Sequence, residues 1–331
     1  MQRLEALQHW VARELGCASC GIAPASEDAG FRRYFRITGA RGTHIVMDAP
    51  PDKENCRPFL AVAELFRAAG VHVPEIYAAD LGQGFLLLED LGRDTYLDVL
   101  TPDNARDLFA QAIDALVRIQ LASRAGALPP YDDALLTREM GLFPDWYVAR
   151  HRALSLPAAL AADLQTVFSR LIQSALAQPQ VFVHRDFMPR NLMLSEPNPG
   201  VLDFQDAVYG PITYDIVSLL RDAFISWEEE QVLDWTIRYW ERARRAGLPV
   251  DNDFAEFWRA FEWMGLQRHL KVLGIFARLN FRDGKPKYLA DTPRFIRYAR
   301  DAASRYNELG PLLRVLDAVE GNASRVAGYT F

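Results

Sequence analysis

Three polar side chains in the middle of the chain have types and a spacing suited to phosphoryl transfer. Asp186 is followed five residues later by Asn191, and Asp203 ends a short apolar run after the turn at 196–200. When a phosphoryl group passes from ATP to an alcohol, one carboxylate orients the hydroxyl and accepts its proton, while an amide and a second carboxylate hold Mg2+. The order His-x-Asp-x-x-x-x-Asn, then Asp-Phe, is far more specific than a single acid. The stretch therefore predicts ATP-dependent phosphoryl transfer.

Short apolar runs position these three side chains. Residues 181–183 precede the polar loop, residues 192–194 follow it, and residues 201–202 lead into the last carboxylate. Runs of this length bounded by turn residues predict strands. The turn at 196–200 predicts a hairpin that returns Asp203 to the polar loop.

Length and composition bound the kind of protein. The chain has 331 residues, half of them apolar, so we expect a globular protein with one large or two smaller domains. The net charge of -6 favours no nucleic-acid partner. The N-terminus lacks a signal-peptide core, and no apolar run approaches the roughly 20 residues of a membrane span. We therefore expect a cytoplasmic protein that binds neither nucleic acid nor membrane.

The first ninety residues predict a small β-rich region. A hairpin is expected over 32–47 and two further strands over 73–77 and 85–88, with helices over 4–15 and 57–69. In a nucleotide-binding region the hairpin covers the phosphates, so Arg32 and Arg33 are candidate phosphate contacts. The alternative is that both are ordinary exposed arginines on a hairpin.

The remainder of the chain predicts mainly helices. One begins at Thr101 and Pro102, a good cap followed by a proline in the first turn. Two more are expected within 135–176, interrupted at Pro144 and Pro157, and Asp215 lies in the first turn of another. An acid there favours the helix dipole and is also suited to brace the polar loop.

Cys17 and Cys20 have C-x-x-C spacing, but neither zinc nor redox chemistry is indicated. A structural zinc site needs about four ligands, and the chain has no second pair. A thioredoxin-like site follows a strand, whereas this pair follows a predicted helix. We expect reduced thiols at the end of that helix.

The motif order, the hairpin-rich start and the helical remainder resemble the aminoglycoside phosphotransferase branch of the protein-kinase-like family, over nearly the whole chain. The resemblance implies an α+β, bilobal protein-kinase-like fold, with a small β-rich ATP-binding lobe (1–90) and a large helical catalytic and acceptor-binding lobe (91–331). Residues 45–54, 85–92 and 184–191 are most similar to the bacterial kinases of cell-wall recycling that phosphorylate the anomeric hydroxyl of N-acetylmuramate and N-acetylglucosamine.

The resemblance also implies roles for particular residues. Asp186 is expected to be the catalytic base, and Asn191 and Asp203 the Mg2+ ligands. The segment Glu89, Asp90 and Leu91 is the expected adenine-contacting hinge, although a plain interdomain linker fits the same residues. The product is expected to be a sugar α-1-phosphate that passes to a nucleotidyltransferase, and the protein a monomer.

The sequence departs from the family pattern at one position. Kinases of this fold usually carry a lysine on the third strand, but residues 44–48 contain none. Either Lys53 reaches back, or Arg33 or Arg36 takes the role, or the site tolerates the absence. The departure keeps open a weakly active nucleotide-binding module as an alternative to an active kinase.

The acceptor is the least determined part of the site. Asp206 and Tyr209 follow the expected metal ligand, so they are candidate acceptor contacts, and Arg190 or Arg185 is a candidate source of positive potential near the reacting groups. The alternative for Arg185 is a structural pin for the loop. Arg268 and His269 are candidates for a carboxylate-bearing acceptor. An aminoglycoside, choline or homoserine acceptor stays open as the alternative on the same fold.

Overall fold

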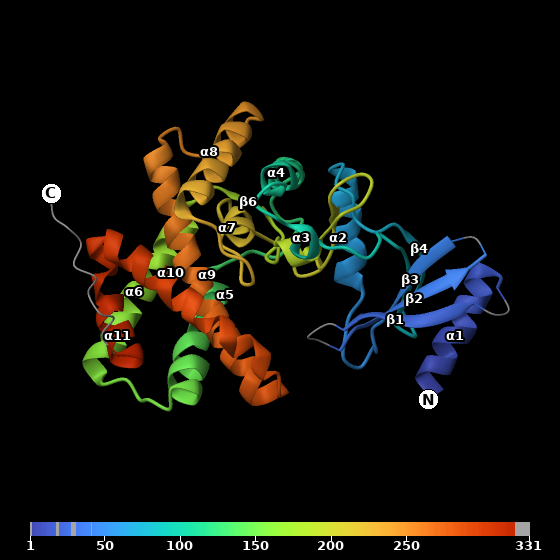
Figure 1. Cartoon of the computed structure of the whole chain (residues 1–331), viewed down its shortest axis with the longest axis horizontal. Helices are drawn as coiled ribbons and strands as arrows, with labels where there is room; N and C mark the ends of the chain where they lie inside the picture. Colours follow the sequence, from blue (N-terminus) through green and yellow to red (C-terminus); the bar gives the residue numbers. More distant parts are fainter. Residues whose placement is uncertain (1, 18–19, 28–30, 41, 322–331) are drawn as a thin grey trace. The chain divides into compact units, whose positions relative to one another are not determined.

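The computed structural model describes residues 2–17, 20–27, 31–40 and 42–321, which form two compact units (Figure 1). The first unit comprises Met1–Ala122 and Pro189–Ala207, and the second comprises Ser123–Met188 and Val208–Phe331. The chain therefore crosses from the second unit back to the first within the polar loop, between Asp186 and Asn191. The functional division into lobes at residue 90 stays a prediction.

The first unit contains an antiparallel five-stranded sheet in the order β1-β2-β3-β5-β4. Its strands are β1 Gly21–Glu27, β2 Arg33–Gly39, β3 Gly42–Asp48, β4 Ile76–Asp80 and β5 Phe85–Glu89. The predicted hairpin is confirmed as β2 and β3, in which Arg33 lies opposite Asp48. The sequence analysis missed β1, since Pro24 disfavours a strand. β1 is an edge strand whose register is irregular after that proline, which is where a sheet tolerates one.

Two predicted helices are confirmed in this unit: α1 Gln2–Leu15 and α2 Arg57–Ala68. α1 packs on the sheet (Figure 1) because its apolar face joins one buried cluster with strand residues: Leu7, Trp10, Val11, Ile37, Val46, Phe85 and Leu87. From α2, the rings of Phe59 and Phe66 lie 4.7 and 6.0 Å from that of Phe204, the residue after Asp203. The helix thereby supports the segment that carries the expected metal ligand.

The rest of the first unit consists of a long helix and four short elements: α4 Ala105–Leu121, α3 Tyr96–Val99, η2 Pro189–Asn191, β7 Leu192–Met193 and β8 Gly200–Val201. The expectation that a helix begins at Thr101 and Pro102 was wrong by one turn, because α4 begins at Ala105 after Asn104. Thr101 instead lies in the preceding turn, where its backbone N–H donates to the side chain of Asn104.

The second unit combines a two-stranded ladder with packed helices (Figure 1). Its elements are α5 Asp133–Leu142, η1 Phe143–His151, α6 Ala158–Ala177, β6 Gln180–Val183, β9 Val208–Pro211, α7 Tyr214–Leu220, α8 Glu229–Arg245, α9 Phe254–Asp283, η3 Pro286–Asp291, α10 Thr292–Arg305, η4 Asn307–Leu309 and α11 Gly310–Glu320. The expected interruption at Pro144 is confirmed, because the α-helix α5 ends at Leu142. The chain runs from α5 directly into the π-helix η1, and Pro144 falls in its first turn, where a missing N–H costs little.

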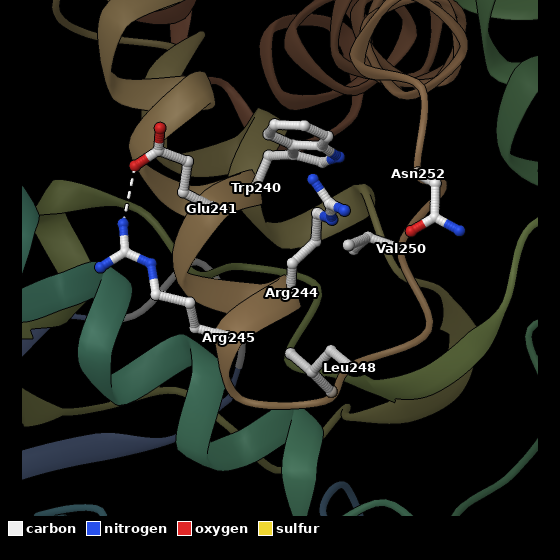
Figure 2. A pocket seen from close by; sticks show the side chains of 7 residues that line it. All are labelled: Trp240, Glu241, Arg244, Arg245, Leu248, Val250 and Asn252. Carbon is white, nitrogen blue, oxygen red and sulfur yellow. Dashed lines mark hydrogen bonds and ion pairs between the residues drawn. The ribbon is translucent and has the colours of Figure 1, made fainter.

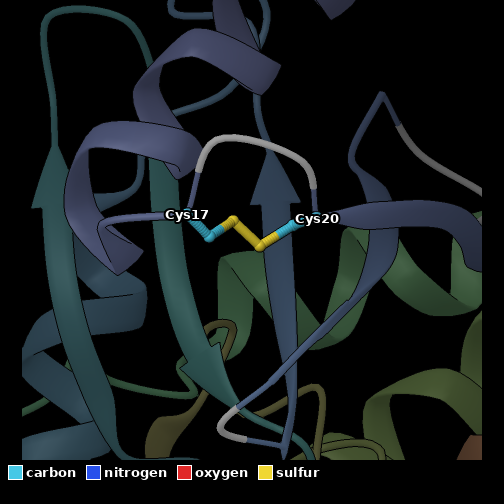
Figure 3. Close-up of a disulfide and its surroundings, with 2 residues drawn as sticks. All are labelled: Cys17 and Cys20. Carbon is cyan, nitrogen blue, oxygen red and sulfur yellow. A yellow bond between two sulfur atoms is a disulfide. The ribbon is translucent and has the colours of Figure 1, made fainter.

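The expectation of reduced thiols at Cys17 and Cys20 was also wrong, because the structure joins them in a disulfide (Figure 3). Their Cα atoms lie 5.9 Å apart, within the usual range for a disulfide. Cys56 is a buried free thiol.

Among the described residues, no helix is long and apolar enough to cross a membrane.

Candidate active site

The loop that carries Asp186 is held through its backbone by a buried carboxylate. β6 ends at Val183, and the N–H groups of His184 and Arg185 donate to the two carboxylate oxygens of Asp215, at 2.6 and 3.0 Å. The N–H of Asp186 in turn donates to Nδ1 of His184 at 3.2 Å. Asp215 lies in the first turn of α7, so the helix that follows the loop in sequence also fixes it.

Asp215 is fully buried, and this burial has an electrostatic consequence. Burial and the nearby charge of Asp186 raise the pKa of Asp215 to about 7, against the opposing effects of the two N–H donors and the positive charge of Arg268. The carboxylate that fixes the loop therefore changes its protonation near neutral pH.

In the first unit, the hairpin of β7 and β8 places the two expected metal ligands side by side. Leu192 pairs with Val201, and the N–H of Leu202 donates to the carbonyl oxygen of Asn191 at 2.9 Å. Asp203 is the next residue along. The hairpin predicted from the sequence therefore brings Asp203 back to Asn191.

The groups at this hairpin suit Mg2+. Asn191 and Asp203 supply only oxygen ligands, and about a third of the Asp203 side chain is exposed. One Asp203 oxygen accepts from Gln205 Nε2 at 2.8 Å and lies 3.4 Å from the guanidinium of Arg32. The described residues contain no cluster of three or more His, Cys, Asp or Glu side chains. This fits Mg2+, which is usually held by one or two carboxylates together with substrate phosphates and water.

Backbone conformation also distinguishes the motif. Among the described non-glycine residues, only Ala153, Arg185 and Asp203 have a positive φ, at 52°, 77° and 61°. L-residues avoid this region, and such residues are concentrated at functional sites. Two of the three belong to the motif that the sequence analysis singled out.

The cations of the sheet are paired with carboxylates. Arg33 forms an ion pair with the buried Asp48, which also accepts from Arg3 at 2.7 Å. Arg36 binds Asp90 through two nitrogens, at 2.7 and 2.9 Å. Lys53 is exposed, and its Nζ lies 5.5 Å from the ring centre of Phe31. Of the three candidates for the missing lysine, the two arginines are therefore already bound to acids.

The side chains of the expected hinge are engaged within the first unit. Glu89 accepts from the N–H of Glu75 at 3.1 Å and lies 3.3 Å from His72. Burial opposes the charge of Asp90, but its bonds to Arg36 keep the pKa of Asp90 below its usual range. Leu91 is buried. The expectation that this segment contacts adenine therefore rests on its backbone groups.

The expected acceptor contacts are distributed over both units. Asp206 is exposed in the first unit, as is Arg190 in η2. Tyr209 is half-buried in β9 of the second unit, where its backbone bonds to Pro129 and Tyr131. Arg268 and His269, both on α9, are also in the second unit.

Arg268 and His269 are buried, with 2% and 0% of their surfaces exposed. Burial, together with the positive charges of Arg221 and Arg268, lowers the pKa of His269 well below its usual value. A neutral imidazole is a poor partner for an acceptor carboxylate, so the structure weakens the case for His269 as an acceptor contact.

The sequence analysis did not single out two buried residues behind the Asp186 loop, one bonded to it directly and the other through the first. Glu139 on α5 bonds to Arg185, with 2.6 Å between the guanidinium and Oε1. Lys271 on α9 lies 2.9 Å from the same oxygen. One signal was present: Lys271 stands within the apolar run Leu270-Lys-Val-Leu273, where a solvated lysine is out of place.

A surface hollow of about 550 Å3 lies at the end of α8 and lacks the groups for phosphoryl transfer (Figure 2). In it Arg244 stacks on Trp240, with 4.6 Å between the guanidinium carbon and the ring centre. Its only carboxylate, Glu241, is paired with Arg245 at 2.7 Å. The hollow therefore carries no general base.

The chain belongs to the phosphotransferase enzyme family, whose model matches residues 21–249. It is 57% identical to the N-acetylmuramate/N-acetylglucosamine kinase of Pseudomonas aeruginosa, over 91% of this chain and 89% of that one. It is 50% identical to the kinase of the same name from Neisseria meningitidis, over the full length of both. The expected family is therefore confirmed.

Solved structures share the fold at low sequence identity. The ADP-bound aminoglycoside phosphotransferase APH(2'')-Ib matches with a TM-score of 0.59 and 13% identity, over 90% of this chain and 98% of that one. Choline kinase LicA from Streptococcus pneumoniae matches with a TM-score of 0.62 and 12% identity, over 89% and 99%. The expected α+β, kinase-like fold is confirmed.

Proposed function

We propose that this protein is a kinase that transfers the γ-phosphoryl group of ATP to the anomeric hydroxyl of N-acetylmuramate and N-acetylglucosamine. The observation that carries the proposal is an identity of 50–57% to kinases named for these two sugars, over at least 91% of this chain. The fold is shared with phosphotransferases for quite different acceptors, so fold alone does not support this choice of acceptor.

In this proposal Asp186 is the general base. Its carboxylate accepts a hydrogen bond from the anomeric hydroxyl and takes the proton as the sugar oxygen bonds to the γ-phosphorus. The bond from that phosphorus to the bridging oxygen breaks, and ADP leaves. The hydrogen bonds from His184 and Arg185 to Asp215 keep the loop in place during this step.

Asn191 and Asp203 would hold Mg2+, which offsets negative charge on the phosphates when it is bound. Arg32 lies next to Asp203, so it is placed to add positive charge beside the same phosphates. We assign Arg33 and Lys53 to phosphate binding as well, and the segment Glu89, Asp90 and Leu91 to adenine.

We assign Arg190 a supporting role, adding positive potential near the transferred group. Asp206 and Tyr209 are the proposed acceptor contacts, because carboxylates bind sugar hydroxyls and aromatic faces bind sugar rings. The product is proposed to be the α-1-phosphate, which suits a nucleotidyltransferase that consumes sugar 1-phosphates. We further propose that the protein acts in the cytoplasm as a monomer.

The test is ADP release with Mg-ATP against six acceptors: N-acetylmuramate, N-acetylglucosamine, N-acetylgalactosamine, kanamycin, choline and homoserine. Phosphorus NMR then locates the phosphate on the product. We expect turnover of the first two sugars with phosphate on the anomeric carbon, and none when Mg2+ is omitted. Turnover restricted to kanamycin, choline or homoserine would refute the acceptor. ATP binding with no turnover on any acceptor would identify a nucleotide-binding module instead.

A further inference from the structure

A buried polar cluster in the second unit converges on one carboxylate, that of Glu139. Its Oε1 lies 2.6 Å from the guanidinium of Arg185 and 2.9 Å from Nζ of Lys271. Its Oε2 accepts from the hydroxyl of Tyr131 and from Nε2 of Gln267. Only 5% of Glu139 and 8% of Lys271 is exposed. Water therefore contributes little to holding these charges.

The cluster is made possible by close approach of α5 to α9. Glu139 and Leu142 lie one turn apart on α5, and Lys271 and Gly274 lie one turn apart on α9. A Cβ atom at Gly274 would lie 2.3 Å from the carbonyl carbon of Leu142, so only glycine allows this approach. Because each pair lies one turn apart on its helix, the same close packing of α5 on α9 brings the ammonium of Lys271 to Glu139.

The cluster contains two cations for one carboxylate. Burial alone would raise the pKa of Glu139, but the charges of Lys271 and Arg185 lower it to about 2. Burial opposes the charge of Lys271 as well, yet Tyr214, Glu139 and Asp186 raise its pKa. Lys271 also donates to the hydroxyl of Tyr214 at 2.9 Å. All three ionisable groups are therefore charged at neutral pH and hold one another in place.

Arg185 stands where the backbone favours glycine. Its φ of 77° lies in the left-handed region, which an L-residue adopts only at a cost. An arginine at this position is accounted for by its side chain, which bonds to Glu139 on α5. The residue immediately before Asp186 is thus tied to two helices, since Glu139 is itself held by Lys271 on α9.

We propose that Lys271 is a positioning residue for phosphoryl transfer: it fixes the Glu139 carboxylate, which fixes Arg185 and thereby the orientation of the neighbouring Asp186. The inference rests on the proposed function only in that Asp186 is the general base. Lys271 is not proposed to touch either substrate. Its contribution is geometric, since a displacement of about 1 Å at a catalytic group can reduce a rate about 100-fold.

The test compares the kinetics of Lys271→Met with those of the wild type. The substitution leaves Glu139 paired one to one with Arg185, so no carboxylate is left buried without a cation. We expect kcat to fall by about 10- to 100-fold while the KM for ATP stays within twofold. Lys271→Arg restores a cation and should recover part of the loss. Reactions are normalised to the folded fraction, which separates positioning from lost stability.

A second variant keeps the test decisive if Lys271→Met fails to fold. Arg185→Gly removes the guanidinium and places glycine where the backbone favours it, so its fold should survive. It should show the same loss of kcat at unchanged KM for ATP. Because Lys271 acts through Glu139, the double variant Glu139→Gln/Lys271→Met, which leaves no buried carboxylate without a cation, should lose little more than the worse of its single variants.

Arg300→Met is the matched control. Arg300 is a partly buried arginine of the same unit, paired with Asp317 at 2.6 Å between α10 and α11. The kcat of Arg300→Met should stay within twofold of the wild-type value. An unchanged kcat in folded Lys271→Met, a rise in KM alone, or fully multiplicative losses in the double variant would each overturn the inference. If the wild type itself turns over neither sugar, the proposed function fails instead.

Discussion

The cations of the sheet and the cations beneath the catalytic loop are paired in different ways. In the first unit, half of the Arg33 side chain is exposed to solvent, and its buried partner Asp48 also binds Arg3. In the second unit, Lys271 and Arg185 share Glu139 in a site that is almost closed. Arg33 can exchange Asp48 for a ligand, because its guanidinium reaches solvent and Asp48 keeps Arg3 as a second partner. A buried pair cannot exchange partners at low cost, so it fixes the chain around it.

The two segments that carry the expected site residues, the hairpin of β7 and β8 and the Asp186 loop, differ in the same way. Asn191 and Asp203 are brought together by two short strands, and Asp203 is one-third exposed. The Asp186 loop is bonded through its backbone to Asp215 and through Arg185 to Glu139, both buried. If the proposed roles hold, the first unit presents Asn191 and Asp203 to substrate and metal, while the second holds Asp186 rigidly.

The largest expected effect is at Asp186. Asp186→Asn keeps the shape of the side chain but removes its capacity to accept a proton, so kcat should fall by about 100-fold or more. The KM for ATP should change little, because the substitution leaves the first unit untouched. Steady-state kinetics on the active sugar measures both. A variant within a few-fold of the wild-type kcat would show that Asp186 is not the base.

An intermediate effect is expected at Asp215 and depends on pH. Its raised pKa of about 7 means that the carboxylate, and with it the full strength of both loop hydrogen bonds, develops as pH rises through neutrality. The wild-type kcat/KM should therefore rise through about pH 7. In Asp215→Asn this rise of kcat/KM should be missing, and its value above pH 7 should be roughly tenfold lower than in the wild type.

Stability provides the control for Asp215. Because its pKa is higher in the folded state, the folded protein binds more protons than the unfolded chain between about pH 4 and 7. The contribution of Asp215 to stability therefore falls as pH rises across that window, and the Asn variant should lack this fall. Melting temperatures between pH 4 and 8 check it. If the kcat/KM of Asp215→Asn still rises through about pH 7 as in the wild type, the rise belongs to another group.

The smallest expected effect is at Arg33. Arg33→Met removes a half-exposed cation that we assign to the phosphates, so the KM for ATP should rise about three- to tenfold while kcat changes little. Arg13→Met is the matched control, because Arg13 is an exposed arginine of the same unit paired with Glu14. A reduced kcat at unchanged KM would place Arg33 with the rigid groups and break the comparison.

Local patterns in the sequence determined much of the architecture. Apolar spacing predicted α1 and α2, and turn residues predicted the hairpin of β2 and β3, because both signals depend on neighbours a few residues away. The motif around Asp186 predicted the chemistry, because its residue types and spacing are set along one stretch of chain.

Partnerships between distant residues were decided only by the tertiary structure. The sequence does not indicate that Glu139 meets Lys271, that Arg36 binds Asp90, or that residues 189–207 join the N-terminal unit. A charged side chain is solvated in the unfolded chain and can pair with any opposite charge. Only the packing of α5 against α9, which Gly274 permits, selects one partner and excludes the water that would compete for it.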